Sequence, residues 1–183
     1  MADSEIMLIE PTEALREAYV DFLEDFRAAG EHPPREEQQA EKDFPAYVRR
    51  LKDQAQGIAL PAGWVPASTY WLVCGGRVIG TCGLRHRLTE ALRDFGGHVG
   101  YGVRPSERGK GYATRMLVMA LDKARQLGLK RVLITCDKDN IASARVIQKN
   151  GGVLDSESYS DQAGRVTQRY WIELDDPENG DGR

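Results

Sequence analysis

One stretch of the chain, residues 97–127, limits the possible folds more than any other. It places a strand pattern, Gly97–Val103, before a loop with two glycines and a helical pattern, Gly109–Leu127. Gly109 and Gly111 let backbone approach a ligand closely, and the first N–H groups of a helix have no partner within the helix. Those N–H groups and the helix dipole favour a bound anion. The stretch therefore predicts an α/β fold with a phosphate site at the start of a helix.

Further strand and helix patterns surround this stretch. The spacing of apolar residues predicts the order β, α, α, β, β, β, α, β, α, β, β, with a hairpin turn at Gly75-Gly76 and a short helical or irregular stretch at 88–95. We expect one domain over residues 1–174, a size that suits a single core, and a polar tail over 175–183. The expected strands are Ile6–Ile9, Thr69–Cys74, Arg77–Leu84, Gly97–Val103, Arg131–Cys136, Val153–Tyr159 and Gln168–Leu174, and the expected helices begin at Thr12, Asp43, Gly109 and Asn140.

Composition disfavours several classes of protein. The 183 residues include 25 basic and 28 acidic ones, so a net charge of −3 gives no overall attraction to nucleic acid or anionic membranes. The three cysteines, Cys74, Cys82 and Cys136, are an odd number without CxxC spacing, which argues against a disulfide framework and a structural zinc. The N-terminal residues lack a signal-peptide pattern, and no long apolar run occurs. We expect a cytoplasmic protein with no metal, no nucleic-acid partner and no membrane partner.

The loop itself carries three positive charges, from Arg104, Arg108 and Lys110. It differs from the Walker pattern GxxxxGK[ST] because Tyr112 follows the second glycine. It differs from the dinucleotide pattern GxGxxG because Thr114 lies where the third glycine would be. Nucleoside triphosphates and NAD are thus disfavoured as ligands. On these residues alone, a solvated turn that starts a helix is the alternative.

The same loop resembles the acetyl-CoA signature of the GNAT superfamily, [QR]xxGx[GA]. The matching residues are Arg108, Gly111 and Ala113, which follow a strand that ends in the Val-x-Pro form at residues 103–105. The preceding run Gly100–Val103 resembles the fourth strand of the family, which a bulge splits so that backbone groups can pair with the pantetheine arm. Glycines in this run suit such a distortion.

Downstream residues extend the resemblance. Asn140 and Ser143 are similar to the second cofactor motif of the family, and Ile147–Gly152 stands in the place of its Tyr-Glu-Lys-x-Gly-Phe run. The resemblance covers about residues 69–174. It implies a GNAT-like acyl-CoA N-acyltransferase fold, which is α/β with a mixed, mostly antiparallel central sheet of splayed strands flanked by helices. It also implies acetyl-CoA as co-substrate, bound by Tyr101, Val103, Arg108, Gly109, Lys110, Gly111, Tyr112, Ala113, Thr114, Asn140 and Ser143.

The activity that this resemblance implies is N-acetyl transfer, in which a primary amine of a small molecule or peptide attacks the thioester directly. The backbone N–H of Val103 would polarise the thioester carbonyl. The usual tyrosine acid is replaced by Ile147, so another group or a water serves as acid, or the thiolate leaves unassisted. The alternatives are a non-catalytic acyl-CoA sensor, an acyltransferase for another acyl-CoA or an O-acceptor, and an interaction domain with a coincidental loop. A homodimer is expected only by analogy with the family.

An amine acceptor also needs a base or a desolvating pocket, because a lysine-like ammonium is only about 0.04% deprotonated at pH 7. Strand alternation turns His98 toward the face opposite Tyr101, which favours a structural role for His98. Tyr101 is expected to form a wall of the cleft. His86 lies in a basic strand end that suits an acidic group of the substrate, with a solvated strand terminus as its alternative. The candidates near the expected cleft are His86, Glu90, His98, Tyr101 and Asp137, and the predicted catalytic residues are Val103, Tyr101 and His86.

Overall fold

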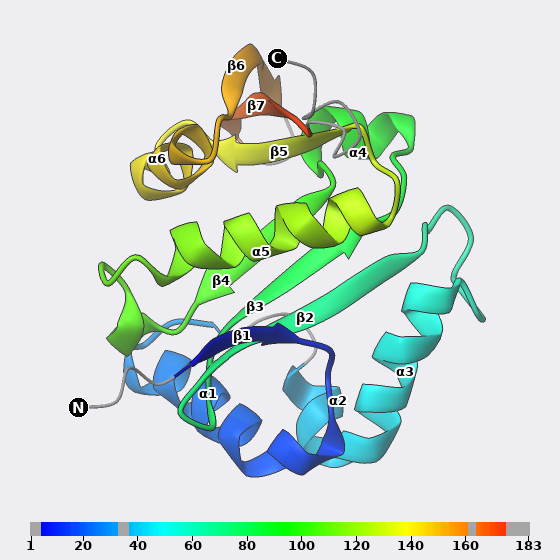
Figure 1. The fold of residues 1–183 in the computed structure, drawn as a ribbon, viewed down its shortest axis with the longest axis vertical. Helices are drawn as coiled ribbons and strands as arrows, with labels where there is room; N and C mark the ends of the chain where they lie inside the picture. Colours follow the sequence, from blue (N-terminus) through cyan, green and yellow to red (C-terminus); the bar gives the residue numbers. More distant parts are fainter. Residues whose placement is uncertain (1–4, 33–36, 161–163, 175–183) are drawn as a thin grey trace, which may run out of the picture.

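A computed structural model of the protein describes residues 5–32, 37–160 and 164–174. The tail expected at 175–183 lies outside these residues. Helices α1, α2 and α3 cover one side of a sheet, and the long helix α5 covers its other side (Figure 1). The elements in chain order are β1 (Ile6–Ile9), η1 (Glu13–Leu15), α1 (Arg16–Ala28), α2 (Glu37–Lys42), α3 (Phe44–Gln56), β2 (Ala67–Cys74), β3 (Arg77–Arg85), α4 (Glu90–Phe95), β4 (Val99–Val103), η2 (Pro105–Glu107), α5 (Tyr112–Gln126), β5 (Arg131–Asp137), α6 (Ile141–Lys149), β6 (Val153–Ser160) and β7 (Arg165–Glu173).

The first sheet has the strand order β1-β2-β3-β4, and every neighbouring pair is antiparallel. The predicted hairpin between β2 and β3 is confirmed. Gly75 and Gly76 have φ of +55° and +77°, and a turn with two such residues matches the twist of the strands that it joins. This hairpin places β3 in the middle of the sheet, where it pairs with β4 on its other edge.

Alternating residues of β2 divide between two hydrophobic cores. Trp71 and Val73 pack with the aromatic residues of α1 and α3, and Tyr19 stacks on Trp71 with ring centroids 4.6 Å apart. Tyr70 and Leu72 point the other way, into the core under α5. Because successive side chains of a strand face opposite sides of a sheet, one strand supports both layers of helices.

A second antiparallel sheet, with the order β5-β7-β6, carries the C-terminal part of the chain. It meets the first sheet at the start of β4, where the N–H of His98 donates to the Leu133 oxygen at 2.7 Å. Gly97 permits this approach, because a Cβ there would lie 2.7 Å from the same oxygen. Farther along, β4 and β5 form no ladder, so the two strands separate toward the ends that carry the α5 loop and α6. The predicted α/β fold is confirmed as antiparallel sheets with splayed strands, flanked by helices.

Several details differ from the sequence prediction. The helix expected from Thr12 begins as the short turn η1, with α1 only from Arg16, and the last strand begins at Arg165 instead of Gln168. Helix α5 begins at Tyr112 instead of Gly109, because the two loop glycines adopt left-handed φ values that a helix does not contain. The bulge expected in the fourth strand is wrong, since β3 and β4 pair in regular register from Val99 to Val103. Register shifts occur instead in β2, at Leu72/Val73, and in β6. The short helix α2 is an additional element.

Candidate active site

The loop before α5 has the backbone conformation that its glycines favour. Gly109 and Gly111 have φ of +77° and +83°, where residues with a Cβ are strained. A Cβ at either position would meet no atom within 4 Å, so the loop is open on that side. Gly111 is the N-cap of α5, and no side chain caps the helix. The first N–H groups of α5, from Tyr112 onward, therefore face outward as potential anion donors.

A cavity of about 660 Å³ opens beside this loop. We call it the loop cavity; its walls come from α1, the end of β4, the loop, the first turn of α5 and one face of α6 along its length. Every predicted cofactor residue except Lys110 lines it. The other lining residues are Phe26, Gly102, Glu107, Ala142, Arg145, Val146 and Lys149.

A second cavity, of about 730 Å³, lies between β4 and β5. We call it the sheet cavity. It shares Tyr101, Asn140 and Ser143 with the loop cavity, so the two cavities adjoin at these three side chains. Its other lining residues are Phe95, Val99, Gly100, Ile134, Thr135, Cys136, Asp137, Tyr159, Arg165 and Thr167.

The wall between the cavities is a small hydrogen-bonded group. The Tyr101 hydroxyl lies 3.1 Å from Ser143 Oγ and donates to the Ser143 carbonyl oxygen at 3.4 Å. Asn140 caps α6, since its Oδ1 accepts from the Ser143 N–H at 3.0 Å. Burial raises the pKa of Tyr101 to about 12, so this phenol is neutral near pH 7 and acts as a donor. Ile147, where the resemblance implies a tyrosine, is fully buried in the core.

Val103 presents its backbone to the opening between the sheets. The next residue, Arg104, donates its N–H to the Ile79 oxygen of β3 at 2.9 Å. Neighbouring residues of an antiparallel strand direct their N–H groups to opposite edges. The N–H of Val103 therefore points away from β3, toward the side of β5. The carbonyl oxygen of Val103 accepts a hydrogen bond from Nε of Arg108 at 3.1 Å.

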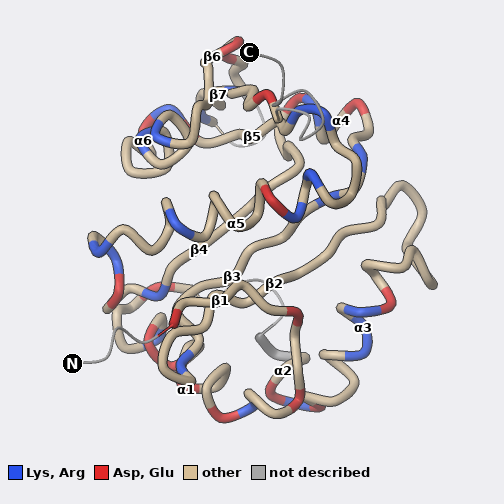
Figure 2. The backbone as a smooth tube through the Cα atoms, in the orientation of Figure 1, with Lys and Arg blue, Asp and Glu red and all other residues tan. Residues whose placement is uncertain are grey.

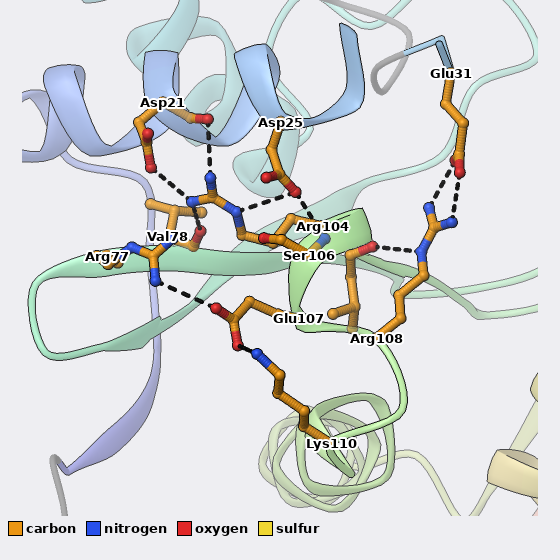
Figure 3. Close-up of polar contacts among 11 residues, drawn as sticks. Asp21, Asp25, Glu31, Arg77, Val78, Arg104, Ser106, Glu107, Arg108 and Lys110 are labelled. Atoms are coloured by element: carbon orange, nitrogen blue, oxygen red, sulfur yellow. Dashed lines mark hydrogen bonds and ion pairs between the residues drawn. The ribbon is translucent and has the colours of Figure 1, made fainter. Parts of the chain in front are cut away.

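Arg104 does not contribute charge to the cofactor loop, which corrects the sequence expectation. Its side chain is only 3% exposed and turns toward α1 (Figure 3). Arg104 is not among the residues that line the loop cavity. There it donates to Asp21 Oδ2 at 2.7 Å and to the Val78 oxygen at 3.3 Å, and its Nε lies 3.4 Å from Asp25 Oδ2. Arg104 thus joins the end of β4 to α1.

The other two charges of the loop are each paired with a carboxylate. Arg108 donates to both oxygens of Glu31 at 2.7 Å, and its guanidinium lies over the Phe26 ring at 5.7 Å (Figure 3). Lys110 donates to Glu107 at 2.8 Å. Since these carboxylates neutralise the side chains, the backbone N–H groups are the remaining anion donors of the loop.

Of the five candidate bases, two line a cavity and three do not. Tyr101 and Asp137 line the sheet cavity, and Asp137 forms an ion pair with Arg165 at 2.9 Å. His86 and Glu90 are lining residues of neither cavity. The ring of His86 instead contacts Ser68 Oγ at 2.8 Å, and burial lowers its pKa.

His98, the fifth candidate, has a structural position. It is 6% exposed, and its Nδ1 accepts from the N–H of Leu133 at 2.9 Å. Burial, together with the charges of Arg85, Arg93 and Arg131, lowers its pKa to about 4. A neutral imidazole that bridges two strands suits the structural role that strand alternation favours.

Sequence reasoning missed several lining residues. Arg145 and Lys149 line the loop cavity, and their spacing of four on the helix after Asn140 was a signal for a shared face. Arg165 and Tyr159 line the sheet cavity from β7 and β6. No local pattern identifies these two, because only the folding of a distant hairpin brings them beside β5.

Within residues 5–32, 37–160 and 164–174, no helix combines the length and the apolar surface that crossing a membrane requires. The same residues contain no group of three or more His, Cys, Asp or Glu side chains placed to hold a metal ion.

Comparison with solved structures finds the same fold in proteins that carry CoA. RimL, described as a ribosomal L7/L12 alpha-N-protein acetyltransferase in complex with coenzyme A, shares 18% identity over 95% of this chain and 96% of its own, with a TM-score of 0.67. Mycobacterium smegmatis RimJ with CoA-disulfide shares 20% over 97% and 84%, with a TM-score of 0.71. The putative acetyltransferase yncA of Salmonella typhimurium, with acetyl-CoA, shares 16% over 97% and 99%, with a TM-score of 0.60.

Comparison with curated proteins finds no match. The sequence of residues 5–153, however, matches the family described as acetyltransferase (GNAT) domain. That range includes β1 to α6 and therefore the glycine loop, the splayed end of β4 and the wall between the two cavities. On this match the chain belongs to the GNAT acetyltransferase family.

Proposed function

We propose that the protein is an acetyl-CoA-dependent N-acetyltransferase that transfers the acetyl group to a primary amine of a peptide or small molecule by direct attack. The observation that carries this proposal is the pair of adjoining cavities, which meet at Tyr101, Asn140 and Ser143. In this scheme the loop cavity takes the CoA part, the sheet cavity takes the acceptor, and the acetyl group lies where they meet.

Binding of CoA rests on the backbone at the start of α5. Gly109 and Gly111 leave the loop open, and the first N–H groups of the helix suit the pyrophosphate. The pantetheine arm would then run toward Tyr101 between the separated strands β4 and β5. Solved relatives of the same fold carry CoA or acetyl-CoA, which supports this assignment.

Polarisation of the thioester carbonyl is assigned to the N–H of Val103. This group points away from β3 into the opening, and a donor aimed at a developing oxyanion stabilises the transition state more than the ground state. As the amine attacks, the C–N bond forms, the C–S bond breaks, and the CoA thiolate departs. A thiolate of pKa near 8.5 is a tolerable leaving group at neutral pH.

Stabilisation of the leaving group and proton transfer use residues that line the two cavities. Tyr101 is a neutral donor and not a base, and a phenol with a pKa of about 12 does not give up its proton to a thiolate of pKa near 8.5. We therefore assign the Tyr101–Ser143 pair to a hydrogen bond that stabilises the departing thiolate, which takes up a proton from water after release. Asp137 is the carboxylate that lines the sheet cavity. We assign it, through a water, to the proton that the attacking amine loses. Ile147 is an aliphatic core side chain and takes no part.

The acceptor class that fits best is an N-terminal α-amine. Its pKa of about 7.7 to 8.0 leaves roughly a tenth or more of it neutral at pH 7, far more than a lysine side chain. A site whose carboxylate, Asp137, is paired with Arg165 is therefore better suited to an α-amine than to a lysine side chain. RimL, which shares the fold, is described as acting on the α-amine of a ribosomal protein. Peptides with free N-termini should therefore head the panel of acceptors.

Calorimetry with acetyl-CoA, with ATP and NAD as controls, tests the cofactor. Release of free thiol in the presence of α-amine peptides, lysine-containing peptides with blocked N-termini and small amines then tests the transfer. Selective binding with thiol release supports the proposal. Selective binding without release by any amine would replace it with a non-catalytic acyl-CoA sensor, and no binding would replace it with an interaction domain.

The substitution Gly111→Asp tests the loop. It puts a carboxylate where the pyrophosphate is proposed to lie, so acetyl-CoA affinity should fall by well over tenfold, on the order of 1.4 kcal/mol or more. Gly128→Asp is the matched control, because Gly128 also has a left-handed φ, +78°, and open space around its Cβ, but it follows the far end of α5. Unchanged affinity in a folded Gly111→Asp protein would remove the loop from the site.

A further inference from the structure

The basic side chains around the loop cavity differ in how far they are neutralised. Arg108, Arg145 and Lys149 line it. Arg108 is bound to both oxygens of Glu31 (Figure 3). Arg145 and Lys149 are exposed, and neither forms an ion pair within the residues that the structure describes. The uncompensated positive charge of the cavity therefore lies on α6 and not on the loop.

These two side chains lie on one face of α6. Residues four apart on a helix are neighbours, about one turn apart, so both can contact one ligand group. Asn150 Nδ2 donates to the Val146 oxygen at 2.8 Å and to the Thr114 oxygen of α5 at 3.5 Å, which ties this end of α6 to the start of α5. Figure 2 shows basic positions on α6 and on the loop before α5, on the same side of the molecule.

CoA carries more phosphate than the helix start alone can bind. Its pyrophosphate is assigned above to the N–H groups of α5, whereas its 3′-phosphate stands on the ribose as a separate anion. A phosphate on a flexible ribose needs side-chain donors that reach out to it, and Lys and Arg are the common ones. A pair of unneutralised cations beside the helix start meets that need.

We propose that Arg145 and Lys149 bind the 3′-phosphate of CoA and make the protein select CoA over its 3′-dephospho form. This inference rests on the proposed function, since it specifies which form of the cofactor the same site accepts. It assigns specificity to the adenosine end of the cofactor, far from the acetyl group. It also implies that a free acetyl-pantetheine would bind far more weakly.

The experiment is calorimetry of acetyl-CoA and acetyl-3′-dephospho-CoA at about 0.15 M ionic strength. Wild-type protein should prefer acetyl-CoA by about tenfold. Arg145→Ala or Lys149→Ala should each weaken the affinity for acetyl-CoA about threefold, which is typical of one charge-assisted contact from an exposed side chain. The double variant should bind the two ligands equally. Lys52→Ala, which removes one exposed charge from α3, is the matched control and should keep the preference.

The outcomes separate this inference from the proposed function. Wild-type protein that binds both ligands equally, or a double variant that keeps the preference, overturns the inference and leaves the proposed cofactor in place. Wild-type protein that binds neither ligand overturns the proposed function and the inference with it. Lys149→Arg should retain the preference, and a loss there would point to packing of α6 instead of charge.

Discussion

Arg108 is held from three sides. Its Nε donates to the Val103 oxygen, its terminal nitrogens donate to Glu31, and its guanidinium lies over Phe26. Hydrogen bonds from Arg108 lower the pKa of Glu31, so this carboxylate stays ionised at neutral pH. An ionised carboxylate beside the loop cavity repels the phosphates of any cofactor that enters. Glu31 therefore positions Arg108 and weakens its attraction for an anion.

Glu31→Gln tests this balance. The amide keeps a hydrogen bond to Arg108 but removes the negative charge, so acetyl-CoA affinity should rise about two- to threefold, a change typical of one exposed charge. Calorimetry at low and high salt measures it, and the gain should shrink as salt screens the charges. Glu17→Gln, on the exposed surface of α1, is the control and should leave affinity unchanged. A fall in acetyl-CoA affinity would mean that the ordering of the loop by Glu31 outweighs the repulsion between Glu31 and the cofactor phosphates.

For single residues, the sequence indicates which side chains belong to the site but not which residues they contact. The GNAT-like motif led to Arg108 and the glycines, and these do line one cavity. Arg104 was wrongly assigned to the loop, because its partner Asp21 is 83 residues away in sequence. The partner of Arg108, Glu31, is 77 residues away. Local spacing contains no information about contacts over such separations.

Helix α1 is fastened to the end of β4 through charge. Asp25, which is 16% exposed, accepts from the N–H of Ser106 at 3.0 Å and lies 3.4 Å from Nε of the buried Arg104. Asp21 contacts the same guanidinium but is 58% exposed. Since Ser106 belongs to η2, these contacts hold α1 against the segment that leads into the glycine loop.

The two aspartates should differ in their contribution to stability. Asp25→Ala removes the carboxylate that forms an ion pair with the buried Arg104 Nε and the acceptor of the Ser106 N–H, which should lower the free energy of unfolding by about 1 to 3 kcal/mol. Asp21→Ala removes an exposed partner and should cost within about 1 kcal/mol. Urea denaturation measures both values. Equal losses in the free energy of unfolding would contradict the expectation that the more buried aspartate contributes more to stability.

Elements with strong periodicity were predictable, and their ends were not. The apolar stripes of α1, α3 and α5 and the Gly75-Gly76 hairpin follow from local spacing and turn chemistry. The start of α5 was placed three residues early, because glycine is compatible with both a helix start and a left-handed loop. The bulge in the fourth strand was expected from the resemblance to the family, and the glycines of this strand only suited it. In the structure these glycines border open space, and the strand pairs in regular register.

At the scale of the whole molecule, the described residues form two antiparallel sheets. The sheets are joined at the start of β4 and separate beyond that point. His98 is central to this joint, since its N–H donates to Leu133 and its Nδ1 accepts from the Leu133 N–H. The order of strands within each sheet, and the point where the sheets part, depend on pairings between distant residues. The sequence predicted splayed strands only through the resemblance, and the division into two sheets required the structure.

His98 should make stability depend on pH. Its pKa falls from 6.5 to about 4 on folding, so between these values the unfolded chain binds a proton that the folded chain does not. Stability therefore declines as pH falls from about 6.5 to 4, by about 3 kcal/mol at most. Thermal unfolding of wild type and His98→Gln over this range measures the effect. As pH falls, the variant should lose less stability than wild type. Equal losses of stability in the two proteins would contradict the structural role of this imidazole.

The shared wall of the two cavities has one further consequence for ligand design. A single molecule that joins an amine to CoA through a two-carbon bridge would cross this wall at Tyr101 and Ser143 and occupy both cavities at once. It would lose translational and rotational freedom once, whereas two separate ligands lose it twice. The binding free energy of such a bisubstrate compound should therefore be more favourable than the sum of the binding free energies of CoA and the free amine. Varying its amine half would then identify the acceptor by affinity, without any need for turnover.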